Sequence, residues 1–279
     1  ICCFLAGKVY ADSGRGQQTE IVVLDVGQGD GIFIRTADGT NLFIDGGSSD
    51  VSGVGNYRIL PFLKSRGIRA IDYWFVSHSD SDHISGLQEI LEENYTIRCL
   101  VVSAQTAEEA SDLQKTAETA GTEFIQIGRG ESLCGSPQNG KNPWTIRCLA
   151  PDKTKTYPDK NAASMALLFE SPKISGLFAG DLGMEQEKEL IRDTSLPQLT
   201  VYKACHHGSN GSNSSELLEK IRPQITVISC GKNNCYGHPG KEAMERILAC
   251  TGKVFLTPSA GQVKITEDSL EAQVETMLK

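Results

Sequence analysis

The sequence lacks several features that define whole classes of proteins. Its 279 residues include nine cysteines, but no two of them are spaced as C-x-x-C, so a zinc ribbon is not expected. Beyond the first residues, no apolar run is long enough to cross a bilayer. Hydrophobic residues make up 39% and charged residues 22% of the chain. This composition is ordinary for a globular domain and excludes long disordered or fibrous segments.

Basic residues are scarce relative to acidic ones. The chain has 27 Lys and Arg against 35 Asp and Glu, a formal net charge of -8. Such a chain is not a general binder of duplex DNA, because Lys and Arg supply most of the affinity for phosphates. A nucleic-acid substrate is still compatible with this charge, because bound cations reverse the local field and a short basic rim suffices.

The cysteines fall mostly in apolar runs, as in Ile97-Arg98-Cys99-Leu100-Val101. They are therefore expected to be buried small hydrophobic residues. Cys230 and Cys235 flank a predicted turn and could pair, although free thiols are the favoured expectation.

The N-terminal segment differs from the rest. Residues 1–7 are apolar, and Val9-Tyr10-Ala11 resembles a small-residue cleavage site. We interpret this segment as the tail of a signal peptide or membrane segment, which predicts an exported protein, extracellular or at the cell surface, with possible membrane attachment through the N-terminus. The alternative is an apolar end without a targeting role. Polar residues 12–19 predict a linker, so residues 1–19 precede a folded domain of residues 20–279.

Apolar patterning predicts an α/β domain built from two similar halves. Strands are expected at 21–24, 32–34, 41–44, 73–76, 99–102, 123–127, 166–169, 176–179, 201–205, 225–229, 254–256 and 263–265. Helices are expected at 59–66, 86–93, 107–120, 184–192, 214–221 and 241–250, and a turn-rich loop at 137–143. Each half, about 20–150 and 151–279, opens with hairpins and then alternates strands with helices. Leu42-Phe43-Ile44-Asp45-Gly46 is echoed by Leu177-Phe178-Ala179-Gly180-Asp181. This order predicts a four-layer αββα sandwich.

Histidine is rare, and its placement is informative. All five histidines lie in three motifs: His78 to His83, His206-His207-Gly208-Ser209, and Tyr236-Gly237-His238-Pro239. Each motif follows an apolar strand, and loops after strands are where α/β proteins place their ligands.

The first motif combines His78, Asp80, Asp82 and His83 within six residues. Four groups that can bind a metal on one tight loop can converge on one or two cations. Imidazole suits zinc, and carboxylate extends the range toward manganese. The alternative, a polar surface turn, is disfavoured by this spacing after a buried strand.

Asp181 and the paired histidines are the next candidates. Asp181 could bridge two cations or cap the helix that starts at Met184. Adjacent side chains on an extended backbone point to opposite faces. One of His206 and His207 is therefore expected to bind metal and the other to contact substrate or pack beneath, with the assignment open.

Three further residues are weaker candidates. His238 precedes Pro239, which stiffens its loop, and it is either a substrate contact or a surface histidine. Asp45 could orient a metal-binding histidine from behind. Asp30 could do the same or stabilise its turn.

Taken together, these motifs resemble the metallo-β-lactamase superfamily, and most of all the hydrolase domain of ComEC-type DNA-internalisation proteins. The motifs that carry the resemblance are Leu24-Asp25-Val26-Gly27-Gln28-Gly29-Asp30, Ile44-Asp45-Gly46-Gly47, His78 to His83, Gly180-Asp181, His206 to Ser209, and Tyr236 to Pro239. They span about residues 20–266.

The chain departs from the superfamily's usual H-x-H-x-D-H motif. Asp80 replaces the second histidine, as in the ComEC-like branch. No histidine lies between His83 and His206, where Asn161 and Ser164 occupy the corresponding region. Both departures argue against β-lactam hydrolysis and make the site richer in oxygen, which leaves zinc and manganese both open.

The resemblance implies two divalent cations, zinc or manganese, that share Asp181 and activate water for in-line attack on phosphorus. Asp82, His207 and His238 are the expected catalytic residues. The metal ligands would be His78, Asp80, Asp82, His83, Asp181 and one or both of His206 and His207. Expected substrate contacts are Ser209, Asn210, Asn161 and Ser164, although the loop at Ser209 and Asn210 could equally be ordinary linkage.

The favoured function is hydrolysis of phosphodiesters by a monomer, with single-stranded DNA as substrate. One alternative is an exported small-molecule phosphodiesterase or esterase similar to phosphorylcholine esterases. Such an enzyme needs an aromatic cage, whereas aromatic residues make up only 6% of the chain. The other alternative is a metal-binding module without catalysis.

Overall fold

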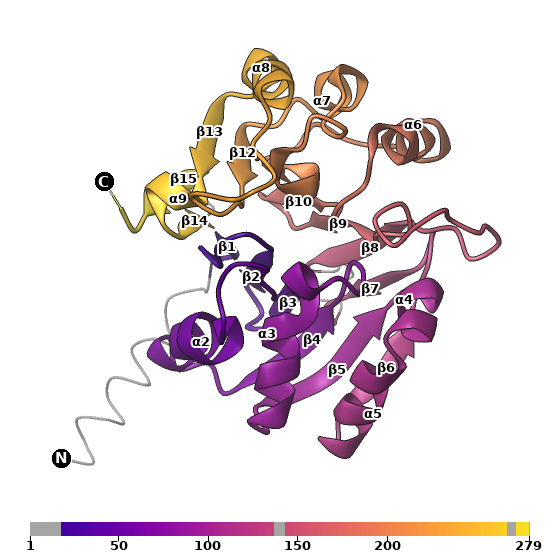
Figure 1. Cartoon of the computed structure of the whole chain (residues 1–279), viewed down its shortest axis with the longest axis vertical. Helices are drawn as coiled ribbons and strands as arrows, with labels where there is room; N and C mark the ends of the chain where they lie inside the picture. The colour runs from indigo at the N-terminus through magenta and orange to yellow at the C-terminus, as the bar shows by residue number, and fades with distance from the viewer. Residues whose placement is uncertain (1–17, 137–142, 267–271, 279) are drawn as a thin grey trace.

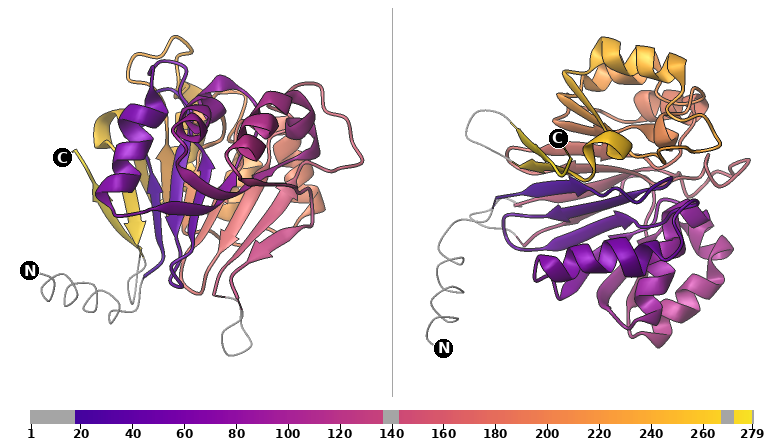
Figure 2. Two further views of the ribbon diagram at one scale, coloured as in Figure 1. Left: turned by 90° about the horizontal axis from the view of Figure 1, so that it is seen from below. Right: turned by 60° about the vertical axis from the view of Figure 1, so that its left-hand side comes forward.

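Two β-sheets face each other at the centre of the molecule, and helices cover both outer faces (Figures 1 and 2). The structure is a computed structural model that describes residues 18–136, 143–266 and 272–278. The right-hand view of Figure 2 shows the two sheets between the two helical layers. The four-layer αββα sandwich predicted from the sequence is therefore confirmed.

The first sheet has eight strands in the order β15-β14-β1-β2-β3-β4-β5-β6. Their bounds are β1 Glu20–Val23, β2 Gly31–Arg35, β3 Asn41–Asp45, β4 Ala70–Phe75, β5 Thr96–Val102, β6 Glu123–Gln126, β14 Val263–Thr266 and β15 Gln273–Thr276. Strands β15 to β3 pair antiparallel, and β3 to β6 pair parallel. The carboxyl ends of the parallel strands therefore meet at one edge of the sheet.

The second sheet has seven strands in the order β13-β12-β11-β10-β9-β8-β7. Their bounds are β7 Ser132–Cys134, β8 Thr145–Ala150, β9 Ala166–Glu170, β10 Ser175–Phe178, β11 Val201–Lys203, β12 Ile225–Ile228 and β13 Lys253–Leu256. Strands β7 to β10 pair antiparallel, and β10 to β13 pair parallel. The second sheet thus repeats the plan of the first.

Each sheet carries its own helices. The first has the π-helix η1 Gly55–Ile59, α2 Leu60–Ser65, α3 Ser81–Glu92, α4 Ala104–Glu109 and α5 Ser111–Thr119. The second has α6 Met184–Asp193, the 3-10 helix η2 Cys205–Gly208, α7 Ser215–Ile221, α8 Lys241–Cys250 and the short α9 Thr257–Ala260. Apolar clusters fill the space between the sheets, around Phe75 and Phe169, and the space under each helical layer, around Trp74 and Tyr202.

Several boundaries differ from those predicted. The helix expected at 86–93 begins at Ser81, because its first turn carries polar residues that hide the apolar periodicity. The helix expected over 107–120 is two helices that meet at Ala110. Strands β7, β8 and β15 were not predicted; β7 and β15 are short edge strands with exposed residues, and β8 contains Arg147, which pairs with Glu170.

The chain moves to the second sheet at β7, before residue 150, and returns to the first sheet at β14. Residues 1–11 of the N-terminal segment, residues 12–17 of the linker, and residues 137–142 of the turn-rich loop lie outside the described residues. Within the described ranges, no helix combines the length and the apolar composition that a bilayer crossing requires. Cys230 and Cys235 are both free thiols, as favoured from the sequence.

Leu167 tests the core between the sheets, where it is fully buried. We expect Leu167→Ala to lower the free energy of unfolding by about 2–5 kcal/mol, because it removes buried methyl groups and leaves a cavity. Leu248→Ala is the matched control, because this leucine of α8 is 60% exposed. Chemical denaturation measures both variants, and equal effects would contradict the assigned core.

Candidate metal centre

The candidate site lies where strands of both sheets end. Asp45 is the last residue of β3, and His78 follows β4 closely. Asp181 follows β10, and the paired histidines follow β11. Because the carboxyl ends of neighbouring parallel strands share an edge, the two facing sheets deliver these side chains to one place.

Four side chains form the larger of two groups of potential metal ligands among the described residues: Asp82, His83, Asp181 and His207. Each offers one ligand atom, and these atoms all lie within 4.8 Å of one another. His83 Nε2 is 3.3 Å from Asp181 Oδ1, while His207 Nε2 is 3.4 Å from Asp82 Oδ2 and 3.6 Å from Asp181 Oδ2. Residues more than a hundred positions apart in the sequence therefore meet. We call these four residues the ligand group.

Asp82 and His83 lie in the first turn of α3 rather than in a loop. An acidic side chain is favoured there by the helix dipole. The start of this helix packs directly on backbone: a Cβ added to Gly47 would lie 2.4 Å from the carbonyl oxygen of Ser81. Glycine at position 47 therefore lets the segment after β3 support the turn that presents both ligands.

The paired histidines adopt an unexpected backbone. His206 and His207 have φ values of 50° and 53°, which places both in the left-handed region. The prediction that an extended backbone turns the two rings to opposite faces is therefore wrong. His206 Nε2 and His207 Nε2 each lie 3.6 Å from Asp181 Oδ2. Of the two, only the buried His207 belongs to the ligand group.

Asp45 and Asp30 lie behind the ligand group. Asp45 accepts hydrogen bonds from the backbone N–H and the hydroxyl of Ser77 at 2.7 and 2.9 Å, and its Oδ2 is 3.0 Å from His83 Nδ1. Asp30 pairs with the buried Lys203 and lies 3.4 Å from His207 Nδ1. The carboxylate of Asp45 beside His83 Nδ1, and the carbonyl oxygen of Ser229 at 3.0 Å from His207 Nδ1, leave each Nε2 directed at the ligand group. An acceptor on Nδ1 is the usual support of a metal-binding histidine.

His78 and Asp80 form a more open pair beside Asp181. The buried His78 ring lies 4.1 Å from that of His83, between centroids. Asp80 Oδ2 is 3.8 Å from His78 Nε2, and its Oδ1 is 3.1 Å from Lys160 Nζ. The Asp80 side chain is 42% exposed, so this pair is less enclosed than the ligand group.

A cleft of about 290 Å³ opens over these side chains. Its lining consists of Gln28, Ser49, Asp80, Ser81, Asp82, Asn161, Asp181, His206, His207, Tyr236 and His238. His238 contributes its ring from the loop before α8, 5.5 Å from the ring of His206.

The expected substrate contacts divide into two kinds. Asn161 lines the cleft, but Ser164 is fully buried, near His78 Nδ1, and accepts the backbone N–H of Asp181 at 3.2 Å. A direct substrate contact is not available to Ser164. Ser209 and Asn210 do not line the cleft, and the side-chain oxygen of Asn210 accepts the backbone N–H of Ala243 in α8.

Asp181 is not a helix cap, because Gly183 occupies the N-cap position of α6. Its carboxylate instead interacts with histidines from both halves of the chain. Burial raises its pKa, but the charges of His207 and His83 outweigh burial and hold it well below the ordinary value.

The surroundings raise the pKa values of His83 and His207 and lower those of His78 and His238. Burial lowers the pKa of His207, but the nearby carboxylates of Asp181 and Asp30 raise it to about 9. The same balance, with Asp181 and Asp45, holds the pKa of His83 well above 6.5. Burial and the charge of His83 lower the pKa of His78 to about 4. Burial and the charges of His206 and His207 lower the pKa of His238 to about 4 as well. Without a cation, protons on His83 and His207 therefore balance the buried carboxylates.

Several buried polar atoms fit a cation better than any protein partner. Among the described residues, the Nε2 atoms of His78, His83 and His207 and Oδ1 of Asp181 have no hydrogen-bond partner. Buried polar atoms are rarely left in this state. All four are atoms that bind divalent cations, so the residues present fit a metal centre.

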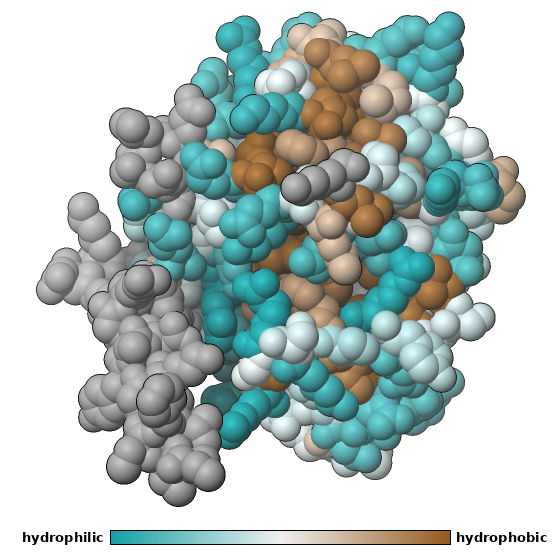
Figure 3. All heavy atoms as spheres, turned by 90° about the vertical axis from the view of Figure 1, so that its left-hand side faces the viewer, coloured by the Kyte–Doolittle hydropathy of each residue, from teal (hydrophilic) through white to brown (hydrophobic). Residues whose placement is uncertain are grey.

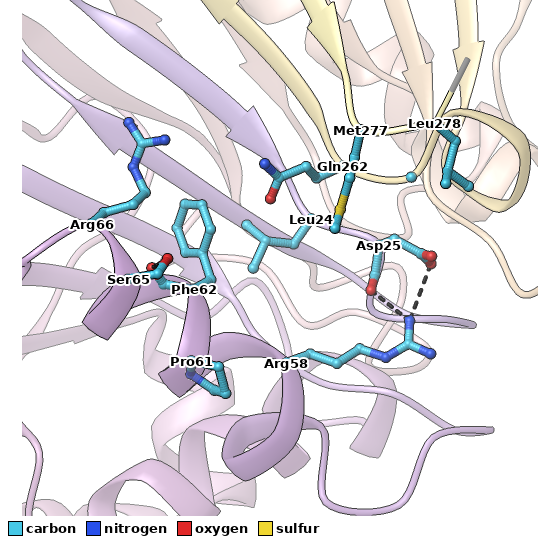
Figure 4. A pocket seen from close by; sticks show the side chains of 11 residues that line it. Leu24, Asp25, Arg58, Pro61, Phe62, Ser65, Arg66, Gln262, Met277 and Leu278 are labelled. Atoms are coloured by element: carbon cyan, nitrogen blue, oxygen red, sulfur yellow. Dashed lines mark hydrogen bonds and ion pairs between the residues drawn. The ribbon is translucent and has the colours of Figure 1, made fainter.

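A larger pocket of about 670 Å³ lies elsewhere, between α2 and the C-terminal strands (Figure 4). Leu24, Phe62 and Met277 point into it, and Arg58 pairs with Asp25 at 3.2 Å on its wall. Figure 3, which looks onto the side where the C-terminus lies, shows apolar patches within a hydrophilic surface. Neither histidine nor cysteine occurs in the described lining of this pocket. The histidines of the three motifs that line a pocket, His206, His207 and His238, therefore lie in the smaller cleft.

Two supporting residues were not predicted from the sequence. Lys203 is 1% exposed and pairs with Asp30; its signal was a single lysine within the apolar run Val201 to Cys205. Ser77 bonds to Asp45, and its hydroxyl is also 3.0 Å from His78 Nδ1. A serine between a buried strand and a metal motif carries no distinctive signal.

The family follows from comparison with known proteins. The family model of the metallo-beta-lactamase superfamily matches residues 24–232. The chain therefore belongs to the metallo-beta-lactamase superfamily, whose members are generally metal-dependent hydrolases.

Individual relatives show which proteins of this superfamily the chain resembles. The chain is 28% identical to ComE operon protein 3 of Bacillus subtilis over 95% of this chain and 35% of that protein. It is 30% identical to Recombination protein 2 of Haemophilus influenzae over 91% of this chain and 30% of that protein. The ComEC-like resemblance is therefore confirmed, while the chain spans about a third of the length of these relatives.

A solved structure agrees with the fold. The metallo-beta-lactamase fold protein YhfI from Bacillus subtilis superposes with a TM-score of 0.57 at 12% identity, covering 85% of this chain and 96% of that one. At this identity the likeness concerns the fold alone.

Asp181 tests the ligand group. We expect Asp181→Asn to weaken binding of Zn²⁺ or Mn²⁺ by more than the roughly 10–100-fold typical of losing an outer-shell partner. The substitution removes the negative charge of the carboxylate that contacts histidines of both halves. Isothermal titration of the metal-free protein measures the affinity. Asp112→Asn is the control, because its side chain is 91% exposed on α5. Equal affinities for the two variants would contradict the site.

The raised pKa values of His83 and His207 predict that, as the pH rises, the metal-free protein becomes less stable while metal affinity increases. A proton on His207 stabilises the metal-free fold below pH 6.5, and this contribution is lost as pH rises through about 9. Metal binding must displace these protons, so metal affinity rises over the same range. Thermal unfolding of both forms between pH 6 and 9, with proton release measured in two buffers, checks both trends. Metal binding without proton release would contradict them.

Proposed function

We propose that the chain is a dinuclear metal-dependent phosphodiesterase that hydrolyses single-stranded DNA. The observation that carries this proposal is the convergence of Asp82, His83, Asp181 and His207 at the base of an open cleft. Zinc or manganese is the proposed metal, because imidazole and carboxylate donors suit both.

Charge supports two cations rather than one. The carboxylates of Asp30, Asp45, Asp80, Asp82 and Asp181 carry five negative charges at the site, and Lys160 and Lys203 beside them carry two positive charges. A single divalent cation would therefore leave the site negative and repel a phosphate. Two would make it positive. His78 and Asp80 adjoin Asp181 and offer a second group of donors. When bound, divalent cations stabilise charge on a phosphoryl group and lower the pKa of water toward about 7.

The chain's own residues bind and orient the substrate in this proposal. His238 and His206 line the cleft beside the ligand group. With a pKa of about 4, His238 is neutral at pH 7. Its neutral ring can donate one hydrogen bond to a phosphate oxygen, which supports a role in substrate binding. Lys160, which pairs with Asp80, supplies positive charge near the same site.

The DNA assignment is supported by the relatives and by the cleft. The names of two similar proteins, Competence protein ComA of Neisseria gonorrhoeae and Recombination protein 2, connect them with competence and recombination. A cleft of about 290 Å³ suits a nucleotide-sized segment of a flexible strand. The apolar residues 1–7 support an exported location with attachment through the N-terminus. We expect the hydrolase to act as a monomer.

Activity on three substrates tests the proposal. The manganese-loaded 279-residue chain should hydrolyse single-stranded DNA and bis-p-nitrophenyl phosphate but not p-nitrophenyl phosphorylcholine. Asp82→Asn should reduce the rate at least about 100-fold, because it weakens charge stabilisation at the site. Asp112→Asn should keep wild-type activity.

Other outcomes would identify the alternatives. Turnover of the choline substrate alone would replace the nuclease with a small-molecule esterase. Tight metal binding without hydrolysis of any of the three would leave a binding module.

A further inference from the structure

Tyr236 is a large aromatic residue left exposed at the rim of the cleft. Its side chain is 60% exposed, and it belongs to the cleft lining together with His206, His207 and His238. It is the only Phe, Tyr or Trp among the described residues of that lining. An isolated exposed tyrosine needs no explanation, but this one adjoins the ligand group.

A series of rings connects Tyr236 with the ligand group. The Tyr236 and His238 rings are 5.8 Å apart between centroids with an interplanar angle of 29°. His238 and His207 are 6.3 Å apart at 28°. Offset, nearly parallel rings are a favourable arrangement. One face of Tyr236 is therefore packed on His238, while much of the ring remains open.

The loop that carries Tyr236 is held by its own side chains and by β1–β2. Asn234 Nδ2 donates to the carbonyl oxygens of Gly231 and His238 at 2.9 and 2.6 Å, and its Oδ1 accepts the His238 N–H at 2.9 Å. Gly231 N–H donates to Gln28 Oε1 at 3.0 Å. The backbone of this loop is thus held in place before a ligand arrives, which lowers the entropic cost of binding.

We propose that Tyr236 recognises the base of a nucleotide next to the scissile phosphodiester by stacking on it. The inference rests on the proposed function and specifies its substrate class: a strand that carries bases, rather than a phosphodiester without rings. Stacking on an aromatic ring requires an unpaired base and tolerates all four. The substrate is therefore single-stranded and of any sequence.

A quaternary ammonium ligand fits this geometry less well. Recognition of choline-like cations uses a cage of several aromatic faces. Tyr236 supplies one face, and its closest ring neighbour is a histidine. A single platform suits a flat base.

The test compares a single-stranded oligonucleotide with one of equal length in which every base is replaced by an abasic analogue. The metal-loaded wild-type chain should show a kcat/KM about 5- to 150-fold higher on the base-bearing strand, the range of a single base–aromatic stack. Tyr236→Leu should lose this preference through a higher KM, and Tyr236→Phe should keep it. Tyr57→Leu is the matched control, because Tyr57 is 80% exposed in η1 and outside the cleft lining.

Binding of phosphorothioate versions of both oligonucleotides, which resist hydrolysis, to the metal-loaded protein, followed by fluorescence anisotropy, gives a second readout. The metal content of Tyr236→Leu verifies an intact site. Hydrolysis of both strands at equal rates by the wild type, or a preference retained in Tyr236→Leu, would overturn the role of Tyr236 and leave the phosphodiesterase standing. Failure of the wild type to hydrolyse or bind either strand would overturn the proposed function and this inference with it.

Discussion

The contact between Asp181 and histidines from both halves is the interaction on which the rest of the structure depends. His83 comes from the first sheet's layer, and His206 and His207 come from the second. A buried carboxylate is costly unless it is paired. Two of its partners, His83 and His207, have Nε2 atoms without a hydrogen-bond partner at the base of a cleft. The arrangement that balances the buried charge of Asp181 can therefore also hold a cation.

The scaffold keeps these groups in place through strained and closely packed backbone. Asp45, His206 and His207 all have φ values between 50° and 58°, a region that residues other than glycine rarely adopt. Such strain concentrates at functional sites, where the surrounding structure compensates for it. Here the compensation includes the hydrogen bonds of Asp45 to Ser77 and of the Asn213 side chain to the backbone of Cys205.

The sequence allowed the sandwich and the identities of the ligand group to be predicted, because the histidines are few and each motif follows an apolar strand. The turn at His206 was not predictable, because the conformation of this turn depends on Asn213. The backbone N–H of Asn213 in turn donates to the carboxylate of Glu187 in α6. The pairing of Lys203 with Asp30 likewise joins residues of different sheets. Local patterns identify residues of the types that bind metals, whereas their orientation depends on neighbours that only the folded chain supplies.

A crystal structure of the manganese-loaded chain, with anomalous scattering recorded at the metal edge, tests the central claim most directly. We expect the strongest anomalous peak within bonding distance of His83 Nε2, His207 Nε2 and the carboxylates of Asp82 and Asp181, with a second peak beside His78 and Asp80. A metal bound elsewhere, with the ligand group bonded only to water, would contradict a metal centre at this site.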